Sequence, residues 1–167
     1  MNDSIRLLTE NDYILYKTIR LQLLKDHPSF FGSDYEEESS FDDSVWKSRL
    51  AKDTVDTYGL FTSNQLVGLA VVVMNPRKKM KHIANLNSMY IKSEYQNQGF
   101  GSKLIDRIIK DLINKGLHRL NLSVVESNQY AKKLYLSKGF IHYGTEPDSI
   151  YHQENYHNLY LMSLLLR

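Results

Sequence analysis

The sequence lacks cysteine, has a net charge of only +2, and contains no apolar run long enough to cross a bilayer. The absence of cysteine excludes disulfides, thiolate metal sites and a cysteine nucleophile. A net charge this small does not favour nucleic acid or a membrane surface as a partner. Charges are spread through residues 1–24, so we do not expect a signal peptide there. We therefore expect a cytoplasmic protein.

The composition is typical of a soluble globular protein. The chain has 167 residues, of which 42% are hydrophobic and 24% are charged, and it shows no repeat, linker or low-complexity tract. This length fits one core of ordinary size, so we expect residues 1–167 to form a single domain. The apolar pattern and the turn residues predict strands at 4–8, 58–62, 65–74, 85–91, 119–125, 140–145 and 156–166, and helices at 10–27, 43–50, 102–115 and 129–138.

The most informative segment is Gln96-Asn97-Gln98-Gly99-Phe100-Gly101, between a predicted strand and a predicted helix. The first N–H groups of a helix lack intrahelical partners and lie at the positive end of its dipole, which suits a phosphate group. Glycine lets the backbone approach a ligand closely. Taken alone, the segment is equally consistent with a plain tight turn. No Gly-Lys-Ser/Thr follows and residues 102–104 contain no third glycine, which excludes a P-loop and a dinucleotide-binding fingerprint.

A second informative segment, residues 128–140, follows the strand predicted at 119–125. Asn128 is suited to cap a helix, because its side chain can accept hydrogen bonds from free N–H groups. Ala131, Leu134 and Tyr135 share one helix face, and Gly139 is placed to end the helix in a left-handed conformation. Taken alone, this segment is an amphipathic helix with a good cap and stop.

Together the two segments resemble the GCN5-related N-acetyltransferase (GNAT) superfamily. Gln96, Gly99 and Gly101 match its acyl-CoA loop, Gln/Arg-x-x-Gly-x-Gly/Ala, and the matched part of the chain covers about residues 85–143. The later family motif is met by Asn128, Ala131, Leu134, Tyr135, Gly139 and Phe140.

The resemblance implies both a fold and an activity. The fold is mixed α/β, with a central, mostly antiparallel mixed sheet of six to seven strands, about four flanking helices, and a splay between the fourth and fifth strands. The activity is transfer of an acetyl group from acetyl-CoA (coenzyme A) to a primary amine, by direct attack in a ternary complex.

The resemblance also implies which residues hold the cofactor. A main-chain N–H of the strand before the loop stabilises the oxyanion, the loop amides and the Ser102 hydroxyl hold the phosphates, and Asn128 bonds to pantetheine. Lys103 either contacts phosphate or is a solvated helix charge, and Gln96 orients the loop. The expected cofactor-binding residues are Met89, Tyr90, Ile91, Gln96, Asn97, Gln98, Gly99, Phe100, Gly101, Ser102, Lys103, Asn128 and Tyr135.

Two side chains are candidates for catalysis. The resemblance makes Tyr135 the general acid that protonates the departing sulfur, whereas the residue pattern alone makes it a core aromatic. Some relatives use a glutamate on the strand before the loop as general base, but residues 86–90 contain no acid. Glu126, at the end of the next strand, is one alternative, although a solvated loop acid fits it too. A water relay on Asn87 or Ser88 is the other.

Acceptor residues are expected in the stretches with least motif character, residues 26–44 and 148–157. Glu36 belongs to an acidic run that either attracts a cationic amine or forms a solvated face. His152 and His157 lack a third ligand of convincing spacing, so we expect no metal site. The candidate acceptor-binding residues are Phe31, Tyr35, Glu36, Asn87, His152 and Tyr156.

The acceptor itself stays open among several hypotheses. The first is a small-molecule amine, and the second is a protein N-terminus or lysine. A third hypothesis is an acyl-CoA-binding sensor without turnover. The apolar stretch 158–166 is either a central buried strand or, where it is exposed, a surface for a homodimer.

Overall fold

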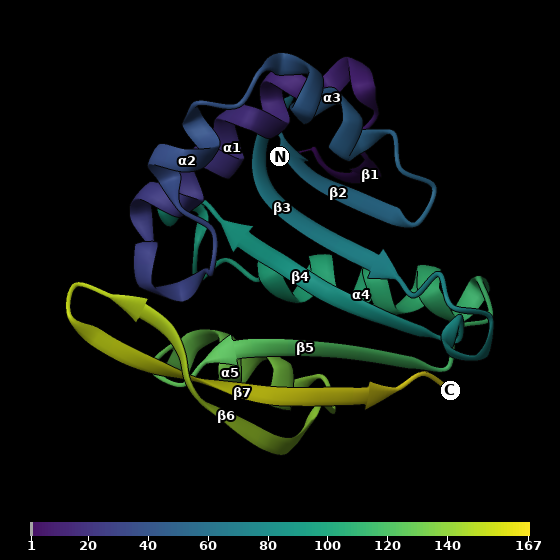
Figure 1. Ribbon diagram of the computed structural model, residues 1–167. Helices are drawn as coiled ribbons and strands as arrows, with labels where there is room; N and C mark the ends of the chain where they lie inside the picture. Colours follow the sequence, from purple (N-terminus) through teal and green to yellow (C-terminus); the bar gives the residue numbers. More distant parts are fainter. Residues whose placement is uncertain (1) are drawn as a thin grey trace.

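The computed structural model describes residues 2–167, which form one seven-stranded sheet with helices on both faces (Figure 1). The strand order is β1-β2-β3-β4-β5-β7-β6. β4 runs parallel to β5, and the other neighbouring strands pair antiparallel, which confirms the predicted mixed sheet. The strands are β1 (Asp3–Leu7), β2 (Val55–Thr62), β3 (Gln65–Met74), β4 (Ile83–Ile91), β5 (Arg119–Val125), β6 (Ile141–His152) and β7 (Asn155–Leu165).

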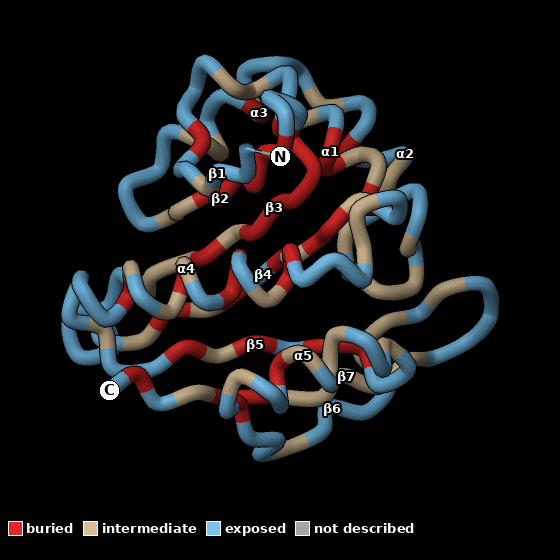
Figure 2. The backbone as a smooth tube through the Cα atoms, turned by 180° about the vertical axis from the view of Figure 1, so that it is seen from behind, coloured by how far each residue is buried: buried red, intermediate tan, exposed pale blue. Residues whose placement is uncertain are grey.

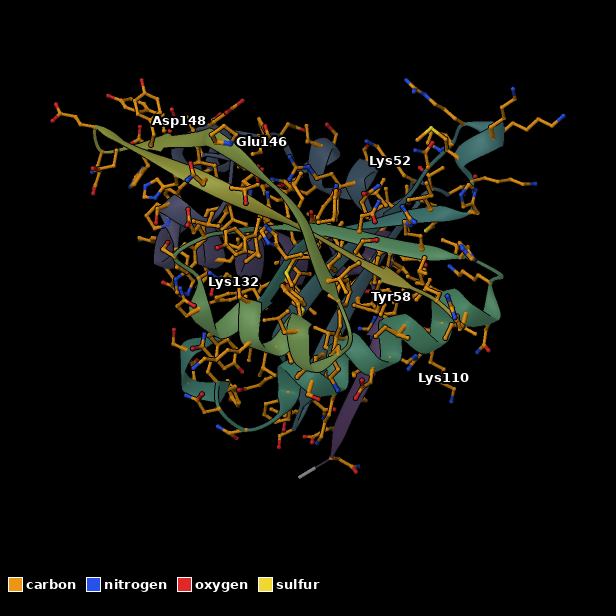
Figure 3. All side chains as sticks on the ribbon, turned by 90° about the horizontal axis from the view of Figure 1, so that it is seen from below. Lys52, Tyr58, Lys110, Lys132, Glu146 and Asp148 are labelled. Atoms are coloured by element: carbon orange, nitrogen blue, oxygen red, sulfur yellow. The ribbon has the colours of Figure 1, made fainter. Side chains whose placement is uncertain are left out.

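Two groups of helices cover opposite faces of the sheet (Figures 1 and 2). One face carries α1 (Tyr13–Asp26), α2 (Tyr35–Ser39) and α3 (Asp43–Leu50), and the other carries α4 (Phe100–Asn114) and α5 (Gln129–Ser137). In Figure 3, Lys52 lies on the first side of the sheet, whereas Lys110 of α4 and Lys132 of α5 lie on the second. There is one helix more than the four predicted, because α2 forms a five-residue helix within a stretch expected to be a loop or short helix.

Each face of the sheet has its own core. The spacing of apolar residues that predicts α4 is the spacing of its buried face, which packs Leu104, Ile105, Ile108 and Leu112 on the sheet. On the other face, Ile19 and Leu23 of α1 and Trp46 of α3 pack against side chains of β2, β3 and β4. The two helix layers therefore hold the middle strands rigidly between them.

The turns at the two hairpins follow from residues with positive φ. Ser63 and Asn64 (φ 47° and 65°) join β2 to β3, which confirms the predicted turn and matches the right-handed strand twist. β6 runs to His152, well beyond the predicted end at residue 145, and turns at Gln153 and Glu154. β6 is an edge strand, so Pro147 and the polar residues around it are tolerated there.

The predicted splay between β4 and β5 is present. Within residues 2–167, pairing of the two strands runs from Ile83–Arg119 to Leu86–Leu122 and then stops. On its other side, β4 has a bulge, because Val72 pairs with Leu86 and Val71 with Ser88. Asn87 lies between these pairs, and the ends of β4 and β5 diverge beyond it.

Among residues 2–167, no helix is long and apolar enough to span a membrane.

Candidate active site

The loop before α4 presents unpaired amides at a helix N-terminus. Gly99 has φ of 80°, in the left-handed region where only glycine is unstrained, and its carbonyl accepts from Lys103 N at 3.0 Å. This is the first hydrogen bond of α4, so the amides of residues 100–102 have no intrahelical partner. Gln96 Nε2 donates to the Ile91 carbonyl at 2.9 Å, so this side chain ties the loop to the end of β4.

The absence of a side chain at Gly101 lets other groups come close to the backbone on the inner side of this turn. A Cβ at Gly101 would lie 3.2 Å from Leu134 Cδ2 and 3.5 Å from Met89 Cε. The Lys103 ammonium forms an ion pair with Asp3 at 2.9 Å and lies over the Phe100 ring at 5.3 Å. The groups of the loop that are suited to a phosphate are thus the amides and the Ser102 hydroxyl, whereas Lys103 is engaged by Asp3.

A cleft of about 320 Å³ runs from this loop to α5, and we call it the loop cleft. Its floor is the end of β4, and its walls are the loop, the start of α5 and the segment after α1. It is lined by His27, Phe30, Phe31, Met89, Tyr90, Ile91, Gln96, Gly101, Ser127, Asn128, Gln129, Tyr130, Ala131, Leu134 and Tyr135.

A second cavity, of about 230 Å³, lies where β4 and β5 diverge, and we call it the splay cavity. Its lining comes from both diverging strands, from the segment after α1, from α5 and from the β6–β7 hairpin. Six residues line both cavities, so the two meet there: Phe30, Phe31, Met89, Asn128, Ala131 and Tyr135.

Tyr135 lies at this junction and is buried, with 6% of its surface exposed. Its ring packs on Phe140 with centroids 5.6 Å apart, and its hydroxyl lies 3.7 Å from Met89 Sδ. Burial raises the pKa of the Tyr135 phenol. The phenol is therefore a neutral proton donor whose strongest neighbour is a weak acceptor, which leaves it available to a ligand.

Asn128 caps α5 and also lines the two cavities. Its side-chain oxygen accepts from Ala131 N at 3.2 Å and caps α5, while the residue lines both cavities. Since the cap uses the oxygen, the amide NH₂ is left for a ligand.

The structure does not bring Glu126 into the site. Its carboxylate is exposed at the end of β5 and accepts from Asn158 Nδ2 at 2.9 Å. In the part of the chain that the structure describes, neither cavity is lined by an aspartate or a glutamate. A carboxylate base within the cleft is thus disfavoured by the geometry.

Of the candidate acceptor residues, Phe31 and Asn87 line the splay cavity. Tyr35 faces a separate groove beside α1, where Lys25 lies over its ring at 5.5 Å. Glu36 is exposed on α2, and neither cavity is lined by it. His152 and Tyr156 lie near the end of the β6–β7 hairpin, outside both linings, and the Tyr156 ring packs at a tilt against Tyr151 with centroids 4.9 Å apart.

Several lining residues were not singled out individually, although they lie in the stretches 26–44 and 148–157 where acceptor residues were expected. His27 stacks on Phe30 with ring centroids 5.3 Å apart and was not singled out, because a lone histidine beyond a helix end has no distinctive pattern. Ser149 and Ile150 reach the splay cavity because β6 is longer than predicted. Among residues 2–167, no cluster of three His, Asp or Glu side chains could hold a metal ion.

These features fit an acyl-CoA: unpaired amides for phosphates, a glycine that permits close approach, and a narrow cleft leading to a buried phenol. They define a class of protein with a site suited to a coenzyme A thioester. The family model described as the acetyltransferase (GNAT) family matches residues 20–140. The chain therefore belongs to this family.

Solved structures show the same fold. An acetyltransferase of the GNAT family from Streptococcus pneumoniae superimposes with a TM-score of 0.83 at 25% identity, covering 99% of this chain and 100% of that one. YncA from Salmonella typhimurium, solved with its cofactor acetyl-CoA, gives a TM-score of 0.84 at 19% identity, covering 100% and 95%.

The curated relatives match over a shorter stretch. Thialysine N-epsilon-acetyltransferase of Bos taurus is 39% identical over 54 residues, which is 32% of this chain and 32% of that protein. The match therefore spans about a third of the relative's length.

Proposed function

We propose that this enzyme acetylates the primary amine of a small molecule by direct attack in a ternary complex. The observation that carries the proposal is the meeting of the loop cleft and the splay cavity at Met89, Asn128 and Tyr135. An acetyl donor in the loop cleft and an amine in the splay cavity would reach one point from two sides. This arrangement serves a single displacement without a covalent enzyme intermediate.

The residues of the chain supply binding and proton transfer. Acetyl-CoA supplies an activated acyl group as a thioester. The first-turn amides of α4 hold its phosphates, and the Asn128 NH₂ bonds to pantetheine. Beyond Leu86, β4 has no β5 partner, so its N–H groups on that side, near Met89 to Ile91, are free for pantetheine and the oxyanion.

Proton transfer is divided between Tyr135 and water. As the C–N bond forms and the C–S bond breaks, the Tyr135 phenol donates its proton to the leaving sulfur. Asn87, at the β4 bulge, holds water that carries the proton lost by the amine. That proton is passed to the Tyr135 phenolate and regenerates the phenol, so the proton transfers balance without a carboxylate base.

The size of the splay cavity favours a small acceptor. Its volume of about 230 Å³ lies below the roughly 300–1,000 Å³ of sites for drug-sized ligands. The similarity to thialysine N-epsilon-acetyltransferase also supports an amine acceptor. A protein N-terminus or lysine is the second candidate, supported by the fold shared with ribosomal-protein-S18-alanine N-acetyltransferase from Escherichia coli.

The experiment is a mass-spectrometric screen of free amines and peptides with the wild type and Tyr135→Phe. We expect acetylated free amines and a kcat lowered by about 10²–10⁴ in the variant, the usual contribution of a general acid. Acetyl-CoA affinity should change little, because the groups proposed to hold it, the first-turn amides of α4 and Asn128, are retained in the variant. Acetylation of peptides alone would refute a small acceptor, and tight acetyl-CoA binding without any turnover would indicate a sensor.

Three further expectations remain part of this proposal: a single domain over residues 1–167, a cytoplasmic location, and a homodimer. The homodimer is supported by the exposed apolar residues Ile141 and Tyr143 on edge strand β6.

A further inference from the structure

A buried ion cluster joins the three helices of the α1–α3 side to β4. Arg20 and Glu38 are 8% and 3% exposed. Arg20 donates to both Glu38 oxygens at 3.1 Å, and Arg49 donates to the same oxygens at 3.1 and 3.3 Å. Burial acts to raise the pKa of the Glu38 carboxyl, but the two guanidiniums outweigh it and the pKa is lowered. Glu38 is therefore ionised and already fully paired, so it does not attract a cationic amine.

The cluster lines a third cavity, of about 210 Å³, which we call the cationic cavity. Its charged lining residues are the cations Arg20, Arg49 and Lys52 and the single anion Glu38. The charges of the lining therefore sum to +2. Its lining residues are Tyr16, Arg20, Ser33, Glu38, Arg49, Lys52, Val55, Thr57, Val71, Val73, Asn87 and Ser88.

Arg49 and Lys52 are the cations with bonding capacity to spare. Arg49 is held over the rings of Trp46 and Phe41 at 5.1 and 5.3 Å, and it keeps N–H groups beyond the two that face Glu38. Lys52 is exposed at the rim and, within residues 2–167, forms no ion pair. An excess of cations on a walled cavity favours an anionic ligand.

The cationic cavity adjoins the splay cavity through Asn87 and Ser88, which line both. The Ser88 hydroxyl accepts from Arg20 Nη1 at 2.9 Å, and the next residue, Met89, contacts the Tyr135 hydroxyl. Ser88 and Met89 are consecutive residues of β4, so the segment that lines the cationic cavity continues directly into the segment that lines the splay cavity.

We infer that the acceptor is an amine that also carries a carboxylate, with the amine in the splay cavity and the carboxylate bound by Arg49 and Lys52 in the cationic cavity. This inference rests on the proposed function and names the acceptor class as amino acids rather than polyamines or plain alkylamines. Arg20 and Glu38 position Arg49 and β4 rather than binding the acceptor directly.

The test compares acceptors that differ only in charge. Glycine, β-alanine, γ-aminobutyrate and lysine are each assayed against their carboxamides, with the wild type, Lys52→Glu and Lys110→Glu. Lys110→Glu is a matched control, because it changes the net charge equally and lies on the other side of the sheet (Figure 3). We expect the best amino acid to exceed its amide in kcat/KM, and Lys52→Glu to lower that preference about tenfold at low salt.

Three outcomes would overturn the inference. The first is acetylation of the amides at the same rate as the acids, which leaves the proposed function intact. The second is an equal effect of Lys110→Glu and Lys52→Glu, which indicates only long-range steering. The third is a rise in KM for acetyl-CoA and not for the acceptor in Lys52→Glu, which assigns the cations to the donor.

A binding measurement separates this inference from the proposed function. Hexanoate and hexanamide are titrated calorimetrically into the protein with coenzyme A present. Binding of hexanoate that exceeds hexanamide, and that Lys52→Glu abolishes, supports the anion site even if no amine is acetylated. Equal binding of the two probes overturns it.

Discussion

Replacing Glu38 by glutamine removes the anion of the cationic cavity while keeping the shape of the side chain. The carboxylate receives four N–H contacts of 3.1–3.3 Å from Arg20 and Arg49. In the variant, the new NH₂ group faces guanidinium donors instead of accepting from them. Arg20, itself buried, then keeps its charge without a counter-ion.

The expected loss of stability is large for a single change. Removing one partner of a buried ion pair costs about 3–5 kcal/mol, out of a total free energy of unfolding of about 5–15 kcal/mol. We place Glu38→Gln at about 3 kcal/mol, because the amide oxygen keeps part of the contacts. For a chain of this length, the corresponding fall in Tm is about 6–12 °C.

The assay is urea denaturation at neutral pH, with Glu36→Gln on the same helix as control. Glu36 is exposed, so its variant should lie within about 0.5 kcal/mol of the wild type. A loss below about 1 kcal/mol for Glu38→Gln would refute the claim that the cluster holds the α1–α3 side to β4.

The pH dependence gives an independent check. The pKa of Glu38 is lowered in the folded state from its ordinary 4.5, so its contribution to stability is complete above that value and is lost as pH falls through the folded-state pKa. The difference in free energy of unfolding between wild type and Glu38→Gln should therefore be constant near neutral pH and become smaller below about pH 4.5. A stability difference that grows as the pH falls would contradict a lowered pKa of Glu38 in the folded state.

Four other predictions follow from the geometry. Gly101→Val places a side chain in the loop cleft and should weaken acetyl-CoA binding at least about tenfold by calorimetry, whereas unchanged affinity would place the cofactor elsewhere. Glu126→Gln should keep kcat within about twofold of the wild-type value, whereas a fall in kcat of about 10² would indicate that Glu126 is the general base. Because burial raises the pKa of Tyr135, kcat/KM should rise with deprotonation of the amine and show no Tyr135-dependent fall up to about pH 10. If the homodimer forms through β6, Ile141→Asp should convert it to monomer in light scattering, and a persistent dimer would exclude this edge.

The sequence predicted the parts of the fold that depend on local pattern. The i, i+3, i+4 spacing in α4 and the cap and stop of α5 required only neighbouring residues. The ion cluster was missed because Arg20, Glu38 and Arg49 come from three separate helices. A signal was nevertheless present: Tyr16, Ile19, Arg20 and Leu23 form one helical face, so the arginine stands at a core position and requires a buried partner.

The acceptor side was less predictable for a different physical reason. Its lining comes from a bulge, from the segment after α1 and from a strand that continues past residue 145, and none of these has a short sequence signature. The acids at residues 36–38 looked alike in the sequence, yet Glu38 is buried and paired while Glu36 is exposed. Whether each glutamate is buried or exposed depends on its tertiary contacts and not on its residue type.

The alternation of side chains along β4 connects the two halves of the site. Ser88 points to the α1–α3 side, where it accepts from Arg20, and Met89 points to the α4–α5 side, where it meets Tyr135. The bulge at Asn87 fixes this register next to the point where β4 leaves β5. The residues proposed to bind acetyl-CoA therefore come mainly from the loop before α4 and from α5. The cations proposed to bind the acceptor are Arg49 of α3 and Lys52 just after α3, and Arg20 of α1 positions Arg49 through Glu38. Substitutions at Arg49 and Lys52 should consequently change the choice of acceptor while leaving acetyl-CoA binding intact, because neither residue lines the loop cleft.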